Sequence, residues 1–526
     1  MMGIANQHND QDQREPPPPP TPLEFPRLRA PALDDQSPLA TDEITKLFSS
    51  VPRHGPSISY ISALHIQVTY DVDLADLLPT DFLPPPAWLA ESTPADAANT
   101  SNTKLNNGVP TPDHAAFYAR AKELLLSNDA AFAFLQRKLQ PSAGPTTRIA
   151  HFRKFWDHLL GMAEFWDTSL DKYAPVQESH RATLRSISRS PLRSLSKSPF
   201  RKRSRSPRRG SSRPRSPGSP VQETYTGRRI GCGLNMPVHY REDAVCAFVE
   251  TVAWAFRCRV ERPKIEPKLQ MGGMVLPIMQ TASVYRTPKE SQRARKGVVE
   301  GPLMAIQCRN MHSFRKEGEN EGEARGEVLD FLKETGLALL IAQKRMREGK
   351  TEQTTWKGKW WAEQRRWGGG TGKQISLVEA ASQSKSARSN EDVKRVPEKY
   401  IKLHPPTSTW EKNVEYMQIG KDRKAQYDDI YIVSSINHHV SILHFHVAKQ
   451  YNDFITNLGT TSPGSSDGSA QQPWSVLSVQ RSRWYDLLKA EDRTEAMRGI
   501  WGVMGWLMRD TQSQETEDVR MGGTEG

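Results

Sequence analysis

The stretch from Tyr427 to Val447, YDDIYIVSSINHHVSILHFHV, carries the densest β-strand pattern in the chain. Branched and aromatic apolar residues crowd two runs, 430–433 and 440–447, as is typical of strands. The residues between them, SINH at 435–438, predict a chain reversal because asparagine tolerates the left-handed backbone conformation. Apolar residues fall on both parities of the second run, so we predict a hairpin covered on both faces by helices.

Hydrophobic patterns on either side of this hairpin predict the other elements. Strands are predicted at Ile58–Tyr70, at Leu303–Arg309 and twice within Lys268–Tyr285. Asp113 is expected to cap the first helix, because its carboxylate can accept a hydrogen bond from the backbone. Helices are predicted at 113–126, 130–139, 148–173, 243–258, 325–347, 484–488 and 490–508. The predicted class is α+β, with a helical N-terminal part, a mixed β-sheet domain flanked by helices, and long disordered segments.

Composition predicts how the 526 residues are divided. Only 36% of them are hydrophobic and 38 are proline, so a good part of the chain is expected to be linker. The predicted parts are a disordered Pro-rich tail (1–40), a mostly helical part (41–180), a disordered Arg/Ser-rich linker (181–226), an α+β domain (227–509) and a disordered tail (510–526). A Trp/Gly-rich insertion at 349–400 interrupts the α+β domain.

The net charge of +12 originates in one segment. Residues 181–220 contain 13 Lys and Arg and no acid, and subtracting these 13 charges leaves −1 for the rest of the chain. No core can form from this composition. Basicity is therefore expected in this insert and not on a folded face.

The basic insert resembles the Arg/Ser-rich tails of splicing-associated nuclear proteins. A simpler interpretation is a basic linker that also serves as a nuclear import signal, centred on Arg201, Lys202 and Arg203. Both interpretations predict a nuclear phosphoprotein, with RNA or DNA as a partner of the insert and a further, unknown protein partner. The Ser-Pro sites predicted to be phosphorylated are Ser190, Ser198, Ser206, Ser216 and Ser219.

The cysteines and the chain start limit the classes further. Four cysteines in apolar surroundings form no CxxC pair, which indicates reduced, buried thiols and neither a zinc site nor a disulfide framework. The first twenty residues lack the apolar core of a signal peptide. No run approaches the roughly 20 apolar residues that a membrane span needs, so no membrane partner is expected.

Three segments resemble an uncharacterised family of filamentous fungi. They are EGPLMAIQCR, KGKWWAEQRRWGGG and the opening hairpin, and the resemblance covers about residues 227–509. No activity is assigned to that family. The resemblance therefore implies a family and no mechanism.

The predicted order helix, three strands, helix, strand also matches the core of the PD-(D/E)xK nuclease superfamily. Such enzymes need an acid on the second strand and Glu-x-Lys on the third to hold a divalent metal. Here the third strand carries Gln307 and Arg309 at the two places. Glutamine lacks the charge and arginine stays protonated, so a related site is expected to be inactive.

Two further motifs are judged structural. His444-x-His446 places both rings on one strand face, as metal sites do, but spacing fixes no third ligand, so satisfied core histidines and no metal are predicted. The glycine run at 368–373 fails as a phosphate loop, because Trp367 and Gln374 stand where glycine and Ser/Thr are needed.

Aromatic and basic residues alternate in the 349–400 insertion. Bases could stack on the rings while the cations contact phosphates. The alternative is a loop anchored by its tryptophans, which Glu352 and Glu363 favour by diluting the positive field. The candidate nucleic-acid contacts are Trp356, Lys357, Lys359, Trp360, Trp361, Arg365 and Arg366.

The sequence as a whole favours a non-catalytic nuclear binding or scaffold protein that is regulated through its Arg/Ser-rich insert. The alternative is a nuclease-like domain, or its inactive relative, that acts on nucleic acid. No cofactor is predicted. An acidic cluster beside Gln307 would favour the enzyme, and a closed, apolar-packed site would favour the scaffold.

Overall fold

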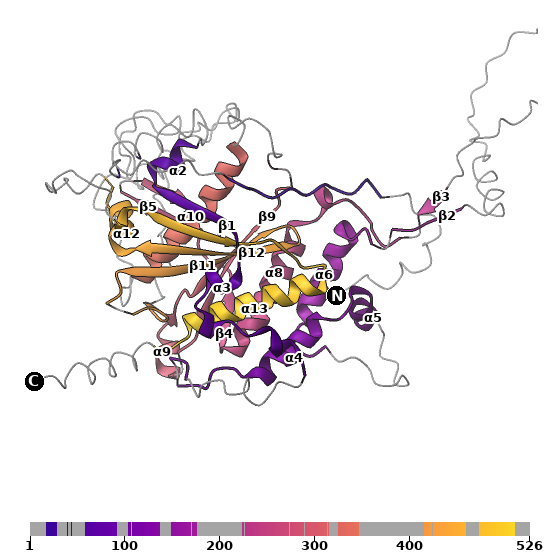
Figure 1. Ribbon diagram of the computed structural model, residues 1–526, viewed down its shortest axis with the longest axis horizontal. Helices are drawn as coiled ribbons and strands as arrows, with labels where there is room; N and C mark the ends of the chain where they lie inside the picture. The colour runs from indigo at the N-terminus through magenta and orange to yellow at the C-terminus, as the bar shows by residue number, and fades with distance from the viewer. Residues whose placement is uncertain are drawn as a thin grey trace, which may run out of the picture. The chain divides into compact units, whose positions relative to one another are not determined.

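The computed structural model describes residues 17–28, 39, 44, 58–91, 104–106, 108–136, 149–169, 171–175, 223–225, 227–272, 274–288, 290–312, 314, 325–346, 415–422, 424–458 and 473–510. The chain divides into two compact units, Met1–Thr21 with Met162–Met236 and Pro22–Gly161 with Pro237–Gly526. The described residues confirm the predicted α+β class, and Figure 1 labels the elements.

The larger unit contains a ten-stranded mixed sheet. Its strands follow the spatial order β1 (Ile66–Val72), β13 (Leu477–Ser482), β12 (His439–Ala448), β11 (Tyr427–Ile436), β9 (Met304–Arg309), β7 (Ala282–Arg286), β8 (Val298–Glu300) and β10 (Glu415–Met417). Beside this path, β4 (Cys258–Glu261) pairs with β7 and β14 (Tyr485–Asp486) with β12. Because β1 pairs in parallel with β13, a segment from the first hundred residues completes the sheet formed by the later ones.

The hairpin β11–β12 lies at the centre of this sheet. Its register pairs Ile436 with His439, which leaves a two-residue turn of Asn437 and His438. Asn437 takes the left-handed conformation at φ +53°, as the sequence predicted. β9 pairs with β11 in parallel and β13 with β12 antiparallel, so neither strand is an edge.

One face of the hairpin packs against α10 (Arg325–Met346) and α12 (Lys449–Thr456). Its residues Ile430, Ile432, Leu443 and Phe445 are buried in one cluster with residues of both helices. The hairpin of β5 (Lys268–Met271) and β6 (Met274–Pro277) contributes Leu269 and Met271 to this cluster.

The opposite face packs against α8 (Val238–Ala255), α13 (Ala490–Leu507) and α3 (Leu74–Leu77). A Cβ atom at Gly499 of α13 would lie 2.6 Å from Cδ1 of Ile442, so glycine permits the close approach of helix and sheet. Tyr431 donates to the carbonyl oxygen of Leu77 at 3.4 Å. Both faces of the hairpin are therefore covered by helices, as predicted.

Helices of the larger unit's early part surround α13. They are α4 (His114–Leu124), α5 (Asn128–Gln136) and the start of α6 (Arg153–Trp166). Asp113 caps α4 as predicted, accepting from the backbone N–H of Ala116 at 2.9 Å. Within the predicted Pro-rich tail, Phe25 stacks on Trp484 and Leu28 is buried.

Three predicted elements differ from the structure. Ile58–Tyr70 contains a helix, α2 (Ser59–Ala63), before β1, because Tyr60, Ala63 and Leu64 are buried at helical spacing. Residues 268–285 hold three strands and not two, the third being β7. Residues 484–488, predicted as a helix, include β14, whose pairing with His439 and Val440 is a long-range contact that local pattern cannot reveal.

The smaller unit pairs two segments that flank residues 176–222 in the chain. β2 (Tyr173–Pro175) pairs antiparallel with β3 (Glu223–Tyr225), and Pro175 lies opposite Glu223. Arg229 forms an ion pair with Asp171 at 2.6 Å, and Tyr225 donates to Asp171 at 2.7 Å. Residues 176–222 therefore connect the two strands of a short ladder.

The four cysteines are buried free thiols, as expected. Burial raises the pKa values of Cys246 and Cys258 to about 12, so both are protonated near neutral pH. Of the helices that the structure describes, none is long and apolar enough to cross a membrane.

Candidate functional site

The predicted nuclease-like positions, Gln307 and Arg309, lie on β9 with their side chains against α10. Gln307 is fully buried, and its Nε2 donates to the backbone carbonyls of Met279 at 2.8 Å and Lys333 at 3.3 Å. Arg309 is only 2% exposed. Neither side chain faces a cleft.

Arg309 belongs to a sealed ion network, which we define as Arg309, Asp330, Glu334 and Arg481. Its guanidinium lies 2.5 Å from the Asp330 carboxylate and 2.7 Å from that of Glu334. Arg481 of β13 also pairs with Glu334, and Ser434 of β11 donates to Glu334 at 2.6 Å. Two carboxylates thus face two guanidiniums, and their charges balance.

Burial and pairing move the two carboxyl groups of the sealed ion network in opposite directions. Burial raises the pKa of Asp330 to about 6, although Arg309 acts against it. Burial would also raise the pKa of Glu334, but Arg309 and Arg481 outweigh it and lower that pKa. Glu334 is therefore the firmly ionised member. Acidic side chains do lie beside the nuclease-like positions, but they are buried and paired with Arg309 and Arg481.

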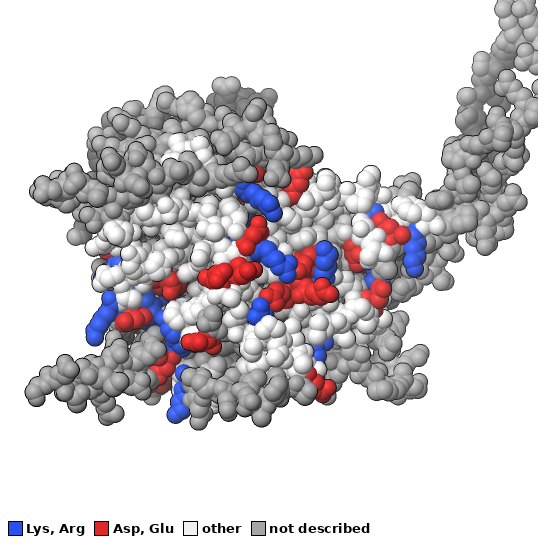
Figure 2. All heavy atoms as spheres, in the orientation of Figure 1, with Lys and Arg blue, Asp and Glu red and all other residues white. Residues whose placement is uncertain are grey.

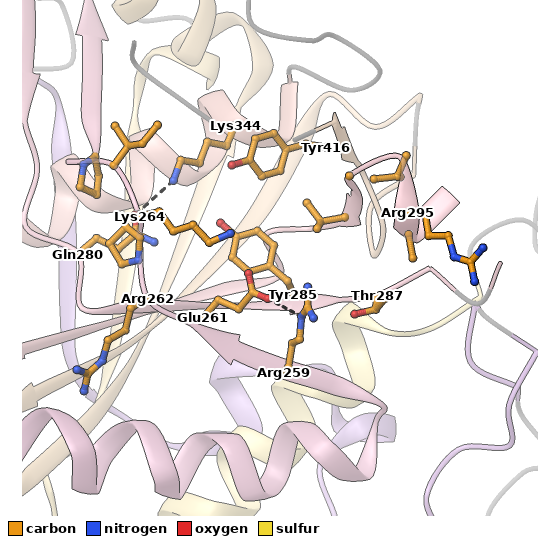
Figure 3. Close-up of a pocket in the computed structure, with 17 residues that line it drawn as sticks. Arg259, Glu261, Arg262, Lys264, Gln280, Tyr285, Thr287, Arg295, Lys344 and Tyr416 are labelled. Atoms are coloured by element: carbon orange, nitrogen blue, oxygen red, sulfur yellow. Dashed lines mark hydrogen bonds and ion pairs between the residues drawn. The ribbon is translucent and has the colours of Figure 1, made fainter. Parts of the chain in front are cut away.

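A pocket of about 450 Å³ lies near the edge of the sheet that is formed by β8 and β10. It is formed by β4 and the loop after it, β7, α9 (Ser291–Arg295), β8, β10 and the end of α10. Figure 3 shows the side chains that line it. Five of them are basic and one is acidic: Arg259, Arg262, Lys264, Arg295, Lys344 and Glu261. We call this site the basic pocket.

The basic pocket has a buried floor and an exposed rim. Lys344, Gln280, Tyr285 and Tyr416 are each less than 10% exposed, and Lys344 donates to the side-chain oxygen of Gln280 at 3.4 Å. In Figure 3, Lys344 and Lys264 point inward. The rim residues Arg259, Arg262, Lys264 and Arg295 are exposed.

Ion pairs offset only part of this positive charge. Glu261 pairs with Arg259 at 2.6 Å, and Asp243 pairs with Arg262 at 2.5 Å. The lining as a whole contains five basic side chains and one acidic side chain. The face in Figure 2 instead mixes blue and red side chains closely. A pocket with cations of one sign focuses positive potential and suits an anion.

The chemistry of the basic pocket favours binding over catalysis. Among its lining residues, all within the described part of the chain, there is no cysteine or histidine, and the single carboxylate is held by Arg259. The rings of Tyr285 and Tyr416 lie 6.2 Å apart at its floor. Cations suit phosphate groups, and tyrosine rings suit a planar base.

The hairpin histidines gain a carboxylate from the opposite strand. Asp429 Oδ1 lies 2.9 Å from His444 Nε2 and 3.0 Å from His446 Nδ1, on the face that bears Tyr431. Burial alone would raise the pKa of Asp429, but hydrogen bonds from both rings outweigh it and hold that pKa far below its usual range. These three residues form a polar cluster that spacing along the chain did not predict.

A second histidine cluster lies at the hairpin turn. His438 and His439 approach Asp486 of β14 at 3.7 and 3.8 Å. Burial lowers the pKa of His438 well below its usual value, with His439 and Lys489 contributing. This cluster is more buried than the one at Asp429.

Several sequence-predicted sites lie outside the described residues. They are the import and phosphorylation residues of the basic insert, the glycine run at 368–373, and the alternating aromatic and basic residues of the 349–400 insertion. Sequence reasoning missed the basic pocket, because its cations come from three segments that are separate in the chain. It also missed Asp429, although counting outward from the two-residue turn places Asp429 opposite His446.

Comparison with known proteins adds no assignment. No family model matches the chain, and neither a curated protein nor a solved structure is similar to it.

Proposed function

We propose that this chain is a non-catalytic nuclear binding protein that holds a nucleic-acid strand through its basic pocket. The observation that carries the proposal is the set of five basic side chains around a 450 Å³ pocket with a single acid. Rim cations would contact phosphates, while the buried tyrosines would contact a base. The closure of Gln307 and Arg309 supports binding without cleavage.

The test is fluorescence anisotropy of a labelled single-stranded RNA or DNA oligomer with the full chain. Lys264→Glu with Arg295→Glu should weaken binding by at least tenfold. For a single strand it should also reduce the salt slope of log K by about 1.4, roughly 0.7 for each lost phosphate contact. The matched control reverses two exposed cations outside the pocket, Arg153→Glu with Lys449→Glu. Equal affinity of the two double variants would refute the pocket as the site.

The basic insert has a separate role in this proposal. It directs the chain to the nucleus and adds electrostatic attraction that phosphorylation removes. Five phosphates at about −1.5 to −2 each bring roughly −8 to −10 against the 13 cations. The β2–β3 ladder is compatible with this role, because it pairs the described segments on either side of residues 176–222. A tagged chain lacking residues 181–220 that still accumulates fully in the nucleus would disprove that the insert directs the chain there.

A second candidate is an inactive nuclease-like domain. What favours it is that the sheet strands β4, β7 and β9 lie between α8 and α10 in the chain and that β11 follows, although β5, β6, α9, β8 and β10 are interspersed and β4 was not among the three predicted strands. We expect no Mg²⁺- or Mn²⁺-dependent cleavage of DNA or RNA, because Gln307 and Arg309 occupy the places of the acid and the lysine. Cleavage that Gln307→Ala abolishes would restore the enzyme hypothesis.

A further inference from the structure

Two histidines and one aspartate converge on the exposed end of the hairpin. Asp429 lies on β11, and His444 and His446 lie two residues apart on β12. Their ligand atoms lie within 4.8 Å of one another. His444 is 16% exposed, Asp429 28% and His446 46%, so the group is anchored on one side and open to solvent on the other.

We propose that Asp429, His444 and His446 bind one divalent transition-metal ion, for which Zn²⁺ is the natural probe. Two imidazoles and one carboxylate are a common ligand set for zinc and for non-haem iron. Zinc binds these atoms at about 2.0–2.2 Å, which places neighbouring ligand atoms roughly 3.3 Å apart in a tetrahedron. The carboxylate oxygen already lies 2.9 and 3.0 Å from the two nitrogens, so small side-chain movements would admit the ion.

The hydrogen bond between His444 and Gln480 orients the ring so that its Nε2 faces Asp429. His444 Nδ1 lies 3.1 Å from the side-chain oxygen of Gln480 on β13, an acceptor that requires a proton on Nδ1. In the neutral ring, Nε2 then presents its lone pair to Asp429 Oδ1 at 2.9 Å. Either a second proton on Nε2 or a bound cation removes the repulsion between these two lone pairs, and a metal ion can replace that proton. Metal-bound histidines are commonly oriented in this way, by a hydrogen bond from the ring nitrogen that does not bind the metal to an oxygen acceptor.

Aromatic neighbours hold both rings in place. Tyr431 stacks on His444 at 4.7 Å, and Tyr427 stacks on His446 at 4.4 Å. Arg509 interacts electrostatically with Asp429, but its guanidinium donates hydrogen bonds to the carbonyl oxygens of Trp506 and Gly420. The ligands are thus fixed before the ion arrives, which reduces the ordering cost of binding.

The second histidine cluster serves as the internal control. His438 and His439 lie more than 3.6 Å from Asp486, and the ammonium group of Lys489 lies 3.5 Å from the same carboxylate. A cation there would displace or repel Lys489. The ion should therefore choose Asp429 over Asp486.

The experiment is calorimetric titration of the chelator-treated full chain with Zn²⁺, with Co²⁺ absorption in the visible range as a second readout. The wild type should bind one equivalent. Asp429→Asn and His446→Ala should each weaken binding at least a hundredfold. Gln480→Ala should weaken it by roughly 10- to 100-fold, because Gln480 orients the His444 ring without contacting the ion. Asp486→Asn should leave the affinity unchanged.

Two results would overturn the proposal. One is a wild type that binds no stoichiometric Zn²⁺ or Co²⁺ while its circular dichroism shows it folded. The other is an affinity that falls equally in Asp429→Asn and Asp486→Asn, which would place the ion elsewhere. Both variants change one carboxylate to an amide of the same shape, so folding is preserved for the comparison.

Discussion

The sealed ion network and the basic pocket both take charged side chains from α10, but they treat charge differently. In the network, Arg309 and Arg481 face Asp330 and Glu334, and all four side chains are at most 2% exposed. In the pocket, five cations and one acid form the lining, and four of the cations lie at the exposed rim. A buried charge is tolerated where a partner balances it, whereas an unbalanced set is maintained where solvent or a ligand can compensate. Charge balance therefore separates the structural cluster from the candidate binding site.

The largest effect is expected from a third carboxylate placed on the network's face of the sheet, opposite Arg481, whose guanidinium is already paired with Glu334. Leu443 is fully buried in the core between the hairpin and α10. Leu443→Asp should cost several kcal/mol against a typical total of about 5–15, and should unfold the larger unit in a thermal melt of the full chain. His444→Ala, on the opposite face and measured with chelator present, should cost only about 1–2 kcal/mol. If Leu443→Asp melted like wild type, the hairpin would not be the core.

The second-largest effect is expected from removing one carboxylate charge of the sealed ion network. Glu334→Gln leaves two buried guanidiniums facing one carboxylate, and breaking such a pair costs about 3–5 kcal/mol. Urea unfolding should show this loss. The control, Glu261→Gln at the pocket rim, removes a partly exposed ion pair and should change stability by no more than about 1 kcal/mol. Equal losses in the two variants would abolish the distinction between the clusters.

Local pattern was sufficient to predict the hairpin, its turn at Asn437, the cap at Asp113 and the long helix α10. Each of these depends on residues near one another in the chain. Where the prediction failed, a distant partner decided the outcome. β14 is a strand because it pairs with the start of β12. The case of α2 is different, because the apolar spacing of its residues suits both a helix and a strand.

The candidate sites were less predictable than the fold for the same reason. Gln307 and Arg309 were singled out by position, but their neutralisation by Asp330 and Glu334 depends on how α10 packs on the sheet. Lys264 lies in the loop after β4 and Arg295 is the last residue of α9, and no spacing rule joins them. Only the histidine cluster had a usable sequence pattern, since hairpin register fixes which residue faces His446.

A third effect should appear when an anion compensates the basic pocket. Inorganic pyrophosphate should stabilise the wild type by about 2.7 kcal/mol at one hundred times its dissociation constant, through mass action on the folded state. Thermal melts at increasing pyrophosphate measure this. Arg295→Gln alone should change stability by less than about 0.5 kcal/mol, because the side chain is exposed, and should reduce the pyrophosphate effect. Full stabilisation of an Arg295→Gln, Lys264→Gln variant would mean that the anion binds elsewhere.

The smallest effect concerns the pH dependence of the sealed ion network. Burial raises the pKa of Asp330 from 3.8 to about 6, so its contribution to stability is complete below pH 3.8 and is lost as pH rises through 6. Glu334, whose pKa is lowered, has the opposite slope and offsets part of this loss in the wild type. The stability of wild type relative to Asp330→Asn should therefore fall between about pH 4 and pH 6, because asparagine cannot ionise while the other carboxylates titrate in both proteins. Urea midpoints at several pH values measure this difference. A difference that stayed constant, or grew with pH, would show that Arg309 compensates Asp330 fully and that the network is balanced at every pH.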